Sequence, residues 1–254
     1  MGRINRRISV TTVTVTHGRT TTDTRAGEVV AEEPLEIRAD GEEVAQVLRT
    51  PGHDVELAHG LLLATGRITS AEDVATARYC EGAVGGANSY NLLDIALREP
   101  RRRFQEPASA CGITAEQRVR ELAAQLPVRS VAVPLDSELV LSIPGVLAER
   151  RARNLPVACV AETDLTRHDV SPTNAAYKVA GSLLLSDDVP AHLLTLATDS
   201  RVTFEFMRAA AVAGFGAVVT TAEVSSMAVD LARETNTVLV GGVTDGRFSV
   251  YSGA

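Results

Sequence analysis

The spacing of apolar residues predicts mostly β-strands in the N-terminal part of the chain. Apolar and polar positions alternate in the β-branched run from Ile8 to Thr16, which is typical of a strand. Two further extended runs flank Ala39-Asp40-Gly41, a hairpin pattern, and Pro34 predicts an edge position for the first of them. A helical period of apolar residues begins near Asp54 and ends at Thr65, before Gly66.

Helical and strand patterns alternate in the C-terminal part, as in a layered α/β domain. Strands are predicted in "LLTLAT", "GAVVTT", "TVLVGGV" and "RFSVY", the last two joined by a tight turn from Thr244 to Arg247. Helices are predicted in "VTFEFMRAAAVAG", closed by Gly214, and in "SSMAVDLARETN", capped by Ser225 or Ser226. Between the two parts, "NSYNLLDIALR" predicts one more strand, and "REPRRRFQEPASA" has no periodicity. We therefore predict an α/β protein, α+β overall, with an N-terminal β-rich subdomain over residues 1–105 and a C-terminal α/β domain over residues 106–254.

Composition narrows the classes of function. The chain has 254 residues, 45% of them apolar, and a formal net charge of -7, which argues against a nucleic-acid partner or an anionic membrane surface. No signal peptide or long apolar span is evident, and three cysteines do not make a disulfide framework, so we expect a cytoplasmic protein with reduced thiols. Cys80 and Cys159 lie in apolar, strand-like runs and are predicted to be structural. The five histidines do not pair with a cysteine at ligand spacing, so no intrinsic metal is expected.

Cys111 lies just upstream of a predicted helix. Thr114 precedes the periodic run "AEQRVRELAAQL", and Gln117 follows three residues later, which is the spacing of a capping box. The positive end of that helix would favour a thiolate at Cys111, and Gly112 leaves room for an attacking group. The alternative is a buried cysteine that acts as a small apolar residue. The residues alone leave both interpretations open.

A second candidate site lies in "RHDVSPTNAAYK". Asp169 is placed in a polar turn before a helix that contains Lys178. The turn is either a helix-capping loop or an anion site at a helix N-terminus.

Seven segments occur in the order found in one protein family. They are "AEEPLEIRADG", "LRTPGHDVELAHGLLLATGRI", "NSYNLLDIAL", "SACG", "DVSPTNAAYKVAG", "SRVTFEFMRAAAVAG" and "VLVGGVTDGRFSVYSG". In this order the chain resembles the FdhD family of formate dehydrogenase accessory sulfurtransferases. The resemblance implies a small β-rich N-terminal part, a C-terminal domain similar to the cytidine deaminase fold without its zinc, and a homodimer.

The resemblance also implies a sulfur relay. A cysteine desulfurase would load a persulfide on Cys111, and the sulfur would pass to the molybdenum bis(molybdopterin guanine dinucleotide) cofactor, the bound substrate, before its insertion into the formate dehydrogenase apoenzyme. Cys111 matches the first cysteine of the family's C-G-x-C, and Thr114 replaces the second. One thiol is enough to carry a persulfide, but an internal disulfide needs two.

The resemblance assigns the cofactor, or a guanine nucleotide in its place, to two regions. The segment "GVTDGR" matches the family's cofactor-binding segment, and its turn amides with Arg247 would hold a phosphate, unless the turn is an ordinary hairpin. The implied binding residues are Gly242, Val243, Thr244, Asp245, Gly246, Arg247, Asp169, Asn174, Lys178 and Arg201.

The match is incomplete in the family segment E-D-V-G-R-H-N-A-x-D-K. Its arginine, histidine and second aspartate are Pro172, Thr173 and Tyr177 in this chain, so binding of an anionic ligand should be weaker or redirected.

Three functions remain open: an FdhD-like sulfur carrier, a divergent sulfurtransferase with another acceptor such as a small metabolite, and a non-catalytic relative that binds a nucleotide-like ligand or a protein. We predict sulfur transfer.

Overall fold

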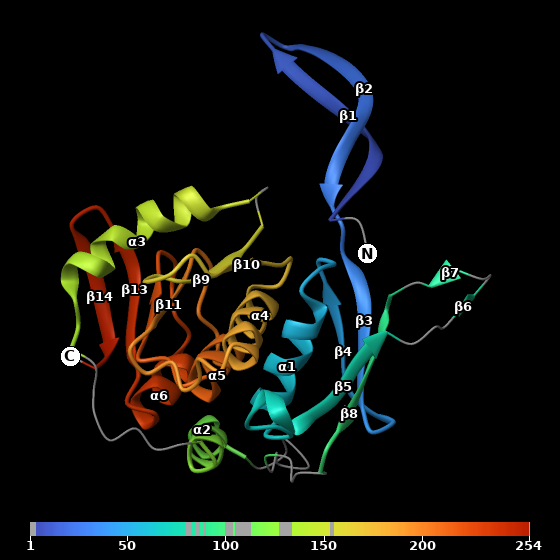
Figure 1. The fold of residues 1–254 in the computed structure, drawn as a ribbon. Helices are drawn as coiled ribbons and strands as arrows, with labels where there is room; N and C mark the ends of the chain where they lie inside the picture. The colour runs from blue at the N-terminus through green and yellow to red at the C-terminus, as the bar shows by residue number, and fades with distance from the viewer. Residues whose placement is uncertain are drawn as a thin grey trace.

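A four-stranded sheet occupies the N-terminal part of the body (Figure 1). The computed structural model describes residues 4–79, 83–84, 87–88, 90–99, 104, 113–126, 134–152 and 155–253; of 83–84 and 87–88 it describes only the backbone. The strand order is β4 (Glu42–Arg49), β3 (Glu33–Ala39), β8 (Leu92–Leu97), β5 (Val74–Tyr79). Helix α1 (Asp54–Ala64) packs on this sheet, and the short helix η1 (Ala71–Asp73) and the small pair β6 (Ala83–Val84) and β7 (Ala87–Asn88) complete this part.

The hairpin predicted around Asp40 and Gly41 is confirmed, since β3 and β4 are antiparallel and both turn residues have positive φ, 51° and 80°. The edge position predicted from Pro34 is wrong, because β3 lies between β4 and β8. The described pairing of β3 with β8 begins only at Glu36. Pro34 therefore lies in a part of a central strand where the missing N–H interrupts no described ladder with β8.

A six-stranded mixed sheet forms the C-terminal part. Its order is β10 (Thr166–His168), β9 (Val157–Val160), β11 (Thr195–Thr198), β12 (Ala217–Thr220), β13 (Val238–Thr244), β14 (Arg247–Ser252). Helix α3 (Ser137–Arg150) covers one face, whereas α4 (Pro172–Leu185), α5 (Phe204–Val212) and α6 (Ser226–Glu234) cover the other, and α2 (Ala115–Ala123) packs against α6. The predicted strands and helices of this part are confirmed, including the ends at Gly214 and the cap at Ser225. The chain is α+β, as predicted.

Alternating residues of the six-stranded sheet enter two apolar clusters. In β9, Val157 and Cys159 contact the cluster under α3, while Ala158 and Val160 belong to the cluster under α4 to α6. The second cluster continues without a break to Leu35 and other residues of the four-stranded sheet. The two sheets therefore share one core, and the division at residues 105 and 106 stays a prediction.

Helices α1 and α4 join the two sheets through two glycines. A Cβ atom at Gly181 would lie 1.8 Å from the carbonyl oxygen of Glu56, and one at Gly60 would lie 2.1 Å from that of Tyr177. The helix backbones are thus too close for any side chain at either position. This contact fixes residues 56–60 of α1 against residues 177–181 of α4, which matters for the site below.

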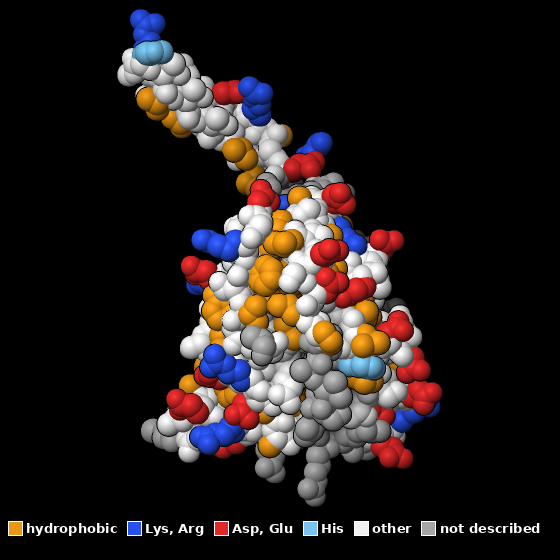
Figure 2. All heavy atoms as spheres, turned by 90° about the vertical axis from the view of Figure 1, so that its left-hand side faces the viewer, with side chains coloured by type: hydrophobic (Ala, Val, Ile, Leu, Met, Phe, Trp, Pro, Cys, Tyr) orange, Lys and Arg blue, Asp and Glu red, His pale blue; other side chains and the backbone are white. Residues whose placement is uncertain are grey.

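Strands β1 (Asn5–Thr16) and β2 (Arg19–Val30) form a separate two-stranded ribbon. Figures 1 and 2 show it projecting from the body. The strand predicted over Ile8 to Thr16 is confirmed. The turn consists of His17 and Gly18, whose φ values of 51° and 78° are those of a tight hairpin. We call residues 5–30 the arm.

Candidate functional site

One edge of the six-stranded sheet gathers most of the predicted binding residues. Strands β11, β12 and β13 are parallel, so their carboxyl ends lie at the same edge. Strand β9 is antiparallel to β11, and β10 is antiparallel to β9, pairing His168 with Val157. The end of β10 and the start of α4 therefore lie at that edge too. We call it the carboxyl edge, formed by loops 169–171, 199–203 and 221–225 and by the end of β13 with the turn that follows it, residues 241–246. Ligands of open α/β sheets bind at such edges.

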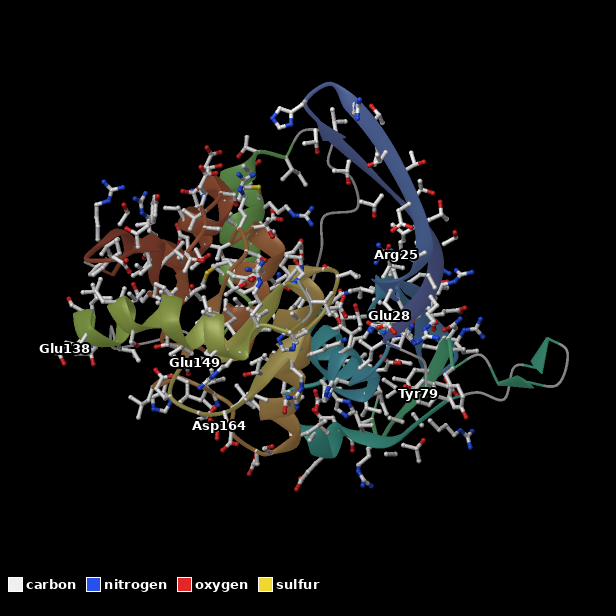
Figure 3. All side chains as sticks on the ribbon, turned by 90° about the horizontal axis from the view of Figure 1, so that it is seen from above. Arg25, Glu28, Tyr79, Glu138, Glu149 and Asp164 are labelled. Atoms are coloured by element: carbon white, nitrogen blue, oxygen red, sulfur yellow. The ribbon has the colours of Figure 1, made fainter. Side chains whose placement is uncertain are left out.

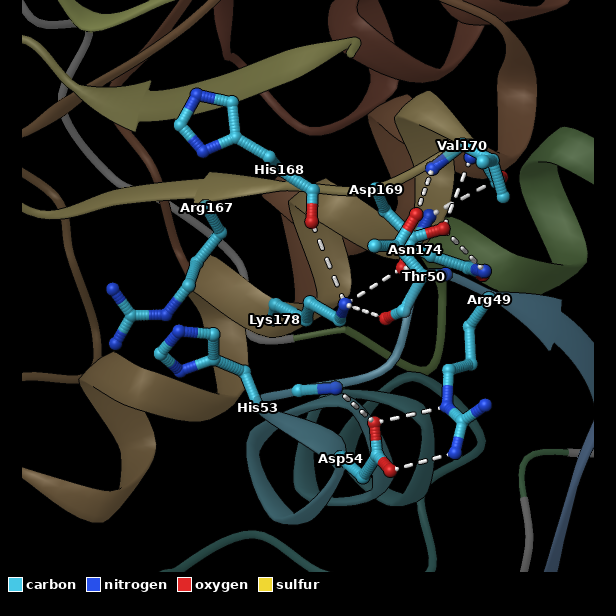
Figure 4. Close-up of polar contacts among 12 residues, drawn as sticks. Arg49, Thr50, His53, Asp54, Arg167, His168, Asp169, Val170, Asn174 and Lys178 are labelled. Atoms are coloured by element: carbon cyan, nitrogen blue, oxygen red, sulfur yellow. Dashed lines mark hydrogen bonds and ion pairs between the residues drawn. The ribbon is translucent and has the colours of Figure 1, made fainter. Parts of the chain in front are cut away.

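Asp169 is fully buried at the carboxyl edge and accepts hydrogen bonds from several directions (Figure 4). Its Oδ2 accepts from the backbone N–H of Thr50 at 3.2 Å and lies 2.7 Å from the ammonium of Lys178. Its Oδ1 accepts from the N–H of Ser171 at 3.0 Å and from the side-chain amide of Asn174 at 3.2 Å. The carboxylate is therefore satisfied entirely by the protein.

Lys178 is equally buried and uses its three donors inside the protein. Besides the ion pair with Asp169, its ammonium donates to the carbonyl oxygen of Thr50 at 3.0 Å and to that of His168 at 3.5 Å. Asn174 donates to the carbonyl oxygen of Leu48 at 2.9 Å. The structure thus brings Asp169, Asn174 and Lys178 together, and they hold the segment 48–50 against the start of α4.

The start of α4 has the contacts of a helix-capping loop, which is one of the two interpretations of this segment. Ser171 is the N-cap residue and accepts from the N–H of Asn174, and Pro172 occupies the first turn. Tyr177 is nearly buried and its hydroxyl reaches Glu205 of α5 at 3.4 Å. Two residues that depart from the family segment, Pro172 and Tyr177, are therefore built into the packing of the helix.

A second buried ion pair, which no sequence pattern indicates, lies beside the first. Arg49 and Asp54 are almost fully buried and share two hydrogen bonds, of 3.1 and 3.0 Å. The hydroxyl of Tyr79 donates to Asp54 at 2.8 Å, and burial together with this carboxylate raises the pKa of Tyr79. Together the two pairs fix both ends of the loop from Arg49 to Asp54.

His53 occupies this loop in a strained conformation. Its φ of 57° is unusual for a residue other than glycine, and its side chain is 53% exposed, with Nδ1 3.1 Å from a carboxylate oxygen of Glu56. Arg167 donates to the same carboxylate at 2.7 Å. Although burial raises the pKa of Glu56, the hydrogen bonds and charges of Arg167 and His53 prevail and hold it at about 2. Glu56 therefore remains anionic at neutral pH.

Arg201 lies on the next loop of the carboxyl edge. Its guanidinium pairs with Glu223 at 2.6 Å, and both side chains are largely exposed. The N–H of Val157 donates to Asp199, which lies in the same loop as Arg201, at 3.2 Å. The carbonyl oxygen of the preceding residue, Pro156, accepts from the N–H of Asp169 at 3.3 Å. The Arg201 loop and the Asp169 network therefore lie on either side of the chain at residues 156–157.

The turn between β13 and β14 continues the carboxyl edge. The N–H of Gly242 donates to the carbonyl oxygen of Ala222 at 2.8 Å, and the φ of Gly242 is 64°. The predicted tight turn is confirmed, with Thr244 paired to Arg247 across Asp245 and Gly246. Arg247 is exposed and has no ion-pair partner among the residues that the structure describes. Among the basic residues predicted to bind the cofactor, Arg247 is therefore the most accessible to an anionic ligand.

Helix α2 begins as predicted. Thr114 accepts from the N–H of Gln117 at 3.2 Å, and the side chain of Gln117 accepts from the N–H of Thr114 at 3.0 Å, so the capping box is present. Cys111, Gly112 and Cys80 lie outside the described residues. Cys159 is fully buried in β9, and burial raises the pKa of its thiol, which agrees with the structural role predicted for it.

Within the described ranges, no group of three or more His, Cys, Asp and Glu side chains is placed to hold a metal ion. In the same ranges, no helix is both long enough and apolar enough to cross a membrane.

Comparisons with known proteins match nearly the whole chain. The family model described as FdhD/NarQ matches residues 30–254. The sulfur carrier protein FdhD of Corynebacterium efficiens is 36% identical, covering 100% of this chain and 99% of the relative, and that of Nocardia farcinica is 37% identical, covering 91% and 90%. A crystal structure described as a formate dehydrogenase accessory protein from Desulfotalea psychrophila has a TM-score of 0.73 at 18% identity and covers 97% of both chains.

Proposed function

This chain belongs to the FdhD/NarQ family, and from that premise we propose that it is a sulfur carrier for formate dehydrogenase maturation, with Cys111 as the carrying residue. The observation that carries the proposal is the similarity, over 100% of this chain, to a relative named sulfur carrier protein FdhD. The capping box at Thr114 supports the assignment to Cys111, because it starts a helix three residues after that cysteine in the sequence.

The proposed loading step is a thiol exchange with the persulfide of a cysteine desulfurase. The Cys111 thiolate attacks the outer sulfur of the desulfurase persulfide; a new S–S bond forms on Cys111, the old S–S bond breaks, and the desulfurase cysteine leaves as a thiolate. No oxidant is consumed. An exposed thiolate is needed for this step, and the buried Cys159 does not provide one.

We propose the carboxyl edge as the place where the acceptor binds, a molybdenum bis(molybdopterin guanine dinucleotide) whose phosphates are anionic. Arg247 supports this assignment because it is exposed on the turn, and Arg201 because it lies on a neighbouring loop where Glu223 would exchange for a phosphate. Asp169, Asn174 and Lys178 would contribute indirectly, since their polar atoms bind one another and the segment 48–50.

A guanine nucleotide should therefore bind weakly and raise the melting temperature, and Arg247→Ala should remove that rise. A ligand at 100 times its Kd stabilises by about 2.7 kcal/mol, which is a shift of several degrees in a melting curve. Differential scanning fluorimetry with a guanine nucleotide at millimolar concentration measures it. Arg120→Ala, an exposed arginine on α2, is the matched control and should keep the rise. A rise that survives Arg247→Ala would exclude this turn.

Formate dehydrogenase activity tests the function directly. In a bacterium that lacks its own FdhD-family protein, expression of this chain should restore the activity, and Cys159→Ala should restore it equally. Cys111→Ala should not, because it removes the proposed carrier, and Cys159, the cysteine that the structure describes, is buried. If the wild-type chain accumulates in folded form and restores nothing, the acceptor is different, and the divergent sulfurtransferase or the non-catalytic relative replaces this proposal.

A further inference from the structure

Two arginines follow each other at the end of α3, and the structure gives them different surroundings. The guanidinium of Arg150 donates to the carbonyl oxygen of Val160 at 2.8 Å. It also lies 3.9 Å from Asp164, which Figure 3 shows beside the end of α3. Arg151 is the C-cap residue of the helix, and its side chain is 56% exposed. The end of α3 therefore uses one arginine inside the protein and presents the next one to solvent.

The exposed arginine lies at the carboxyl edge. The Nε of Arg151 is 3.7 Å from a carboxylate oxygen of Asp199, the first residue of loop 199–203. Arg201 belongs to the same loop, two residues further on, which is at most about 7 Å of chain. The structure thus brings a basic side chain of α3 next to the loop that carries Arg201.

The backbone at the end of α3 is held against the start of α4 through His168, the last residue of β10. The Nε2 of His168 donates to the carbonyl oxygen of Arg150 at 2.8 Å. Figure 4 shows this ring turned away from Lys178, which binds the carbonyl oxygen of His168. His168 stands where the family segment begins with glutamate. A carboxylate cannot donate to a carbonyl oxygen, so this contact depends on the histidine.

The ion pair of Arg151 is easily exchanged for a ligand. Exposed ion pairs contribute little to stability, and the contact described for this one is a single distance of 3.7 Å. Asp199 keeps other partners when the arginine leaves, because its Oδ1 accepts from the N–H of Val157 at 3.2 Å and from the hydroxyl of Ser200 at 3.1 Å. Arg201 is largely exposed as well. Both guanidiniums can therefore turn to an anion without leaving a buried charge unpaired.

Two neighbouring arginines fit a diphosphate. A guanidinium is a rigid fork of N–H donors that matches two phosphate oxygens, and a diphosphate offers such oxygens on two phosphorus atoms. The start of α4 supplies no cation of this kind, since Pro172 and Thr173 stand where the family segment has arginine and histidine. Basic side chains from α3 and from loop 199–203 would provide the charge that those two positions lack.

We propose that Arg151 is a phosphate-binding residue of this chain, which together with Arg201 holds the diphosphate of a nucleotide-like ligand at the carboxyl edge. This inference rests on the proposed function in one respect, the binding of an anionic acceptor at that edge. It does not depend on sulfur transfer, because nucleotide binding is measured on the protein whether or not Cys111 carries sulfur.

A titration with guanosine diphosphate, free of divalent cations and followed by the melting temperature, tests the residue. Arg151→Ala should raise the Kd at least about tenfold, because the ligand loses a charge-assisted hydrogen bond, and the melting temperature without ligand should not change. Arg38→Ala is the matched control: it breaks another exposed ion pair, with Glu36 at 2.6 Å on the four-stranded sheet, and should keep the wild-type Kd. Inorganic diphosphate should lose affinity for Arg151→Ala by the same factor, because the arginine binds phosphate and not the base.

Asp199→Asn distinguishes an arginine that binds the ligand from one that only forms a surface ion pair. The amide oxygen still accepts from the N–H of Val157, but the charge that competes with the ligand for Arg151 is removed, so the Kd should fall severalfold. In the Arg151→Ala background the same change should give a smaller gain, because the two residues act on the ligand together.

Three results of these titrations would overturn the proposal. They are an unchanged Kd in Arg151→Ala, a loss of affinity for guanosine diphosphate that inorganic diphosphate does not show, and an equal gain from Asp199→Asn with and without Arg151. A wild type that binds neither compound would exclude both this site and the acceptor at the carboxyl edge. If Arg151→Ala weakens both compounds but the chain restores no formate dehydrogenase activity, the phosphate site stands and the proposed function fails.

Discussion

Cys111→Ala is expected to lose all sulfur loading, whereas Cys80→Ala and Cys159→Ala keep it. Incubation with a cysteine desulfurase and cysteine should add one sulfur, about 32 Da, to the wild type. Loading requires a thiolate that the desulfurase persulfide can reach. Cys159 fails this requirement, because it is fully buried and burial raises the pKa of its thiol. Intact-protein mass spectrometry with peptide mapping measures the added sulfur and its position.

Thr114→Cys extends this experiment to the residue that stands in place of the family's second cysteine. A second thiol should allow the loaded form to release sulfide and close an internal disulfide, so the variant should hold its persulfide for a shorter time than the wild type. The variant also loses the N-cap hydroxyl of α2, at a cost of about 0.5–2 kcal/mol. Thr114→Ala controls for that cost and should retain the persulfide. Sulfur found on Cys80 or Cys159, or on no cysteine with any desulfurase, would remove Cys111 as the carrier.

Lys178→Met is expected to lower the free energy of unfolding by about 3–5 kcal/mol, because it leaves a buried carboxylate without its counter-ion. Asp169 is 0% exposed, and Lys178 is the cation that lies 2.7 Å from it. The change also leaves the carbonyl oxygen of Thr50 without one donor. Urea unfolding followed by circular dichroism gives the free energy and the m-value.

Two further variants separate the charge from the packing. Lys178→Met/Asp169→Asn should recover part of the loss, since no unpaired charge remains buried. The recovery is incomplete, because the backbone N–H groups of Thr50 and Ser171 bind different oxygens of Asp169, and an amide has one oxygen to accept from them. Arg201→Met breaks an ion pair at the same edge of the sheet, but both partners are largely exposed, and it should cost at most about 1 kcal/mol. If Lys178→Met and Arg201→Met lower the free energy of unfolding equally, the buried ion pair contributes no more to stability than the exposed one.

Sequence patterns identified the elements whose ends are set by neighbouring residues. The helix that ends before Gly66, the helix that ends at Gly214 and the capping box of Thr114 all lie where predicted, because a left-handed residue or a cap acts within one turn of the chain. The hairpin at Asp40-Gly41 is of the same kind. The order of the quoted segments likewise predicted the family, to which the chain belongs.

The sequence by itself thus determined the local elements, the family and Cys111 as the candidate carrier, since each depends on residues close together in the chain or on their order. The tertiary structure decided which charged residues are available to a ligand. Lys178 forms an ion pair with Asp169 and donates to the carbonyl oxygen of Thr50, 128 residues away. A lysine predicted to bind an anion is therefore buried inside the protein, while Arg247 is exposed. Strand order decided that β3 is central despite Pro34, and that the arm pairs only with itself. Contacts of this range arise because packing brings distant segments together to bury apolar area, and no local pattern specifies which segments those are.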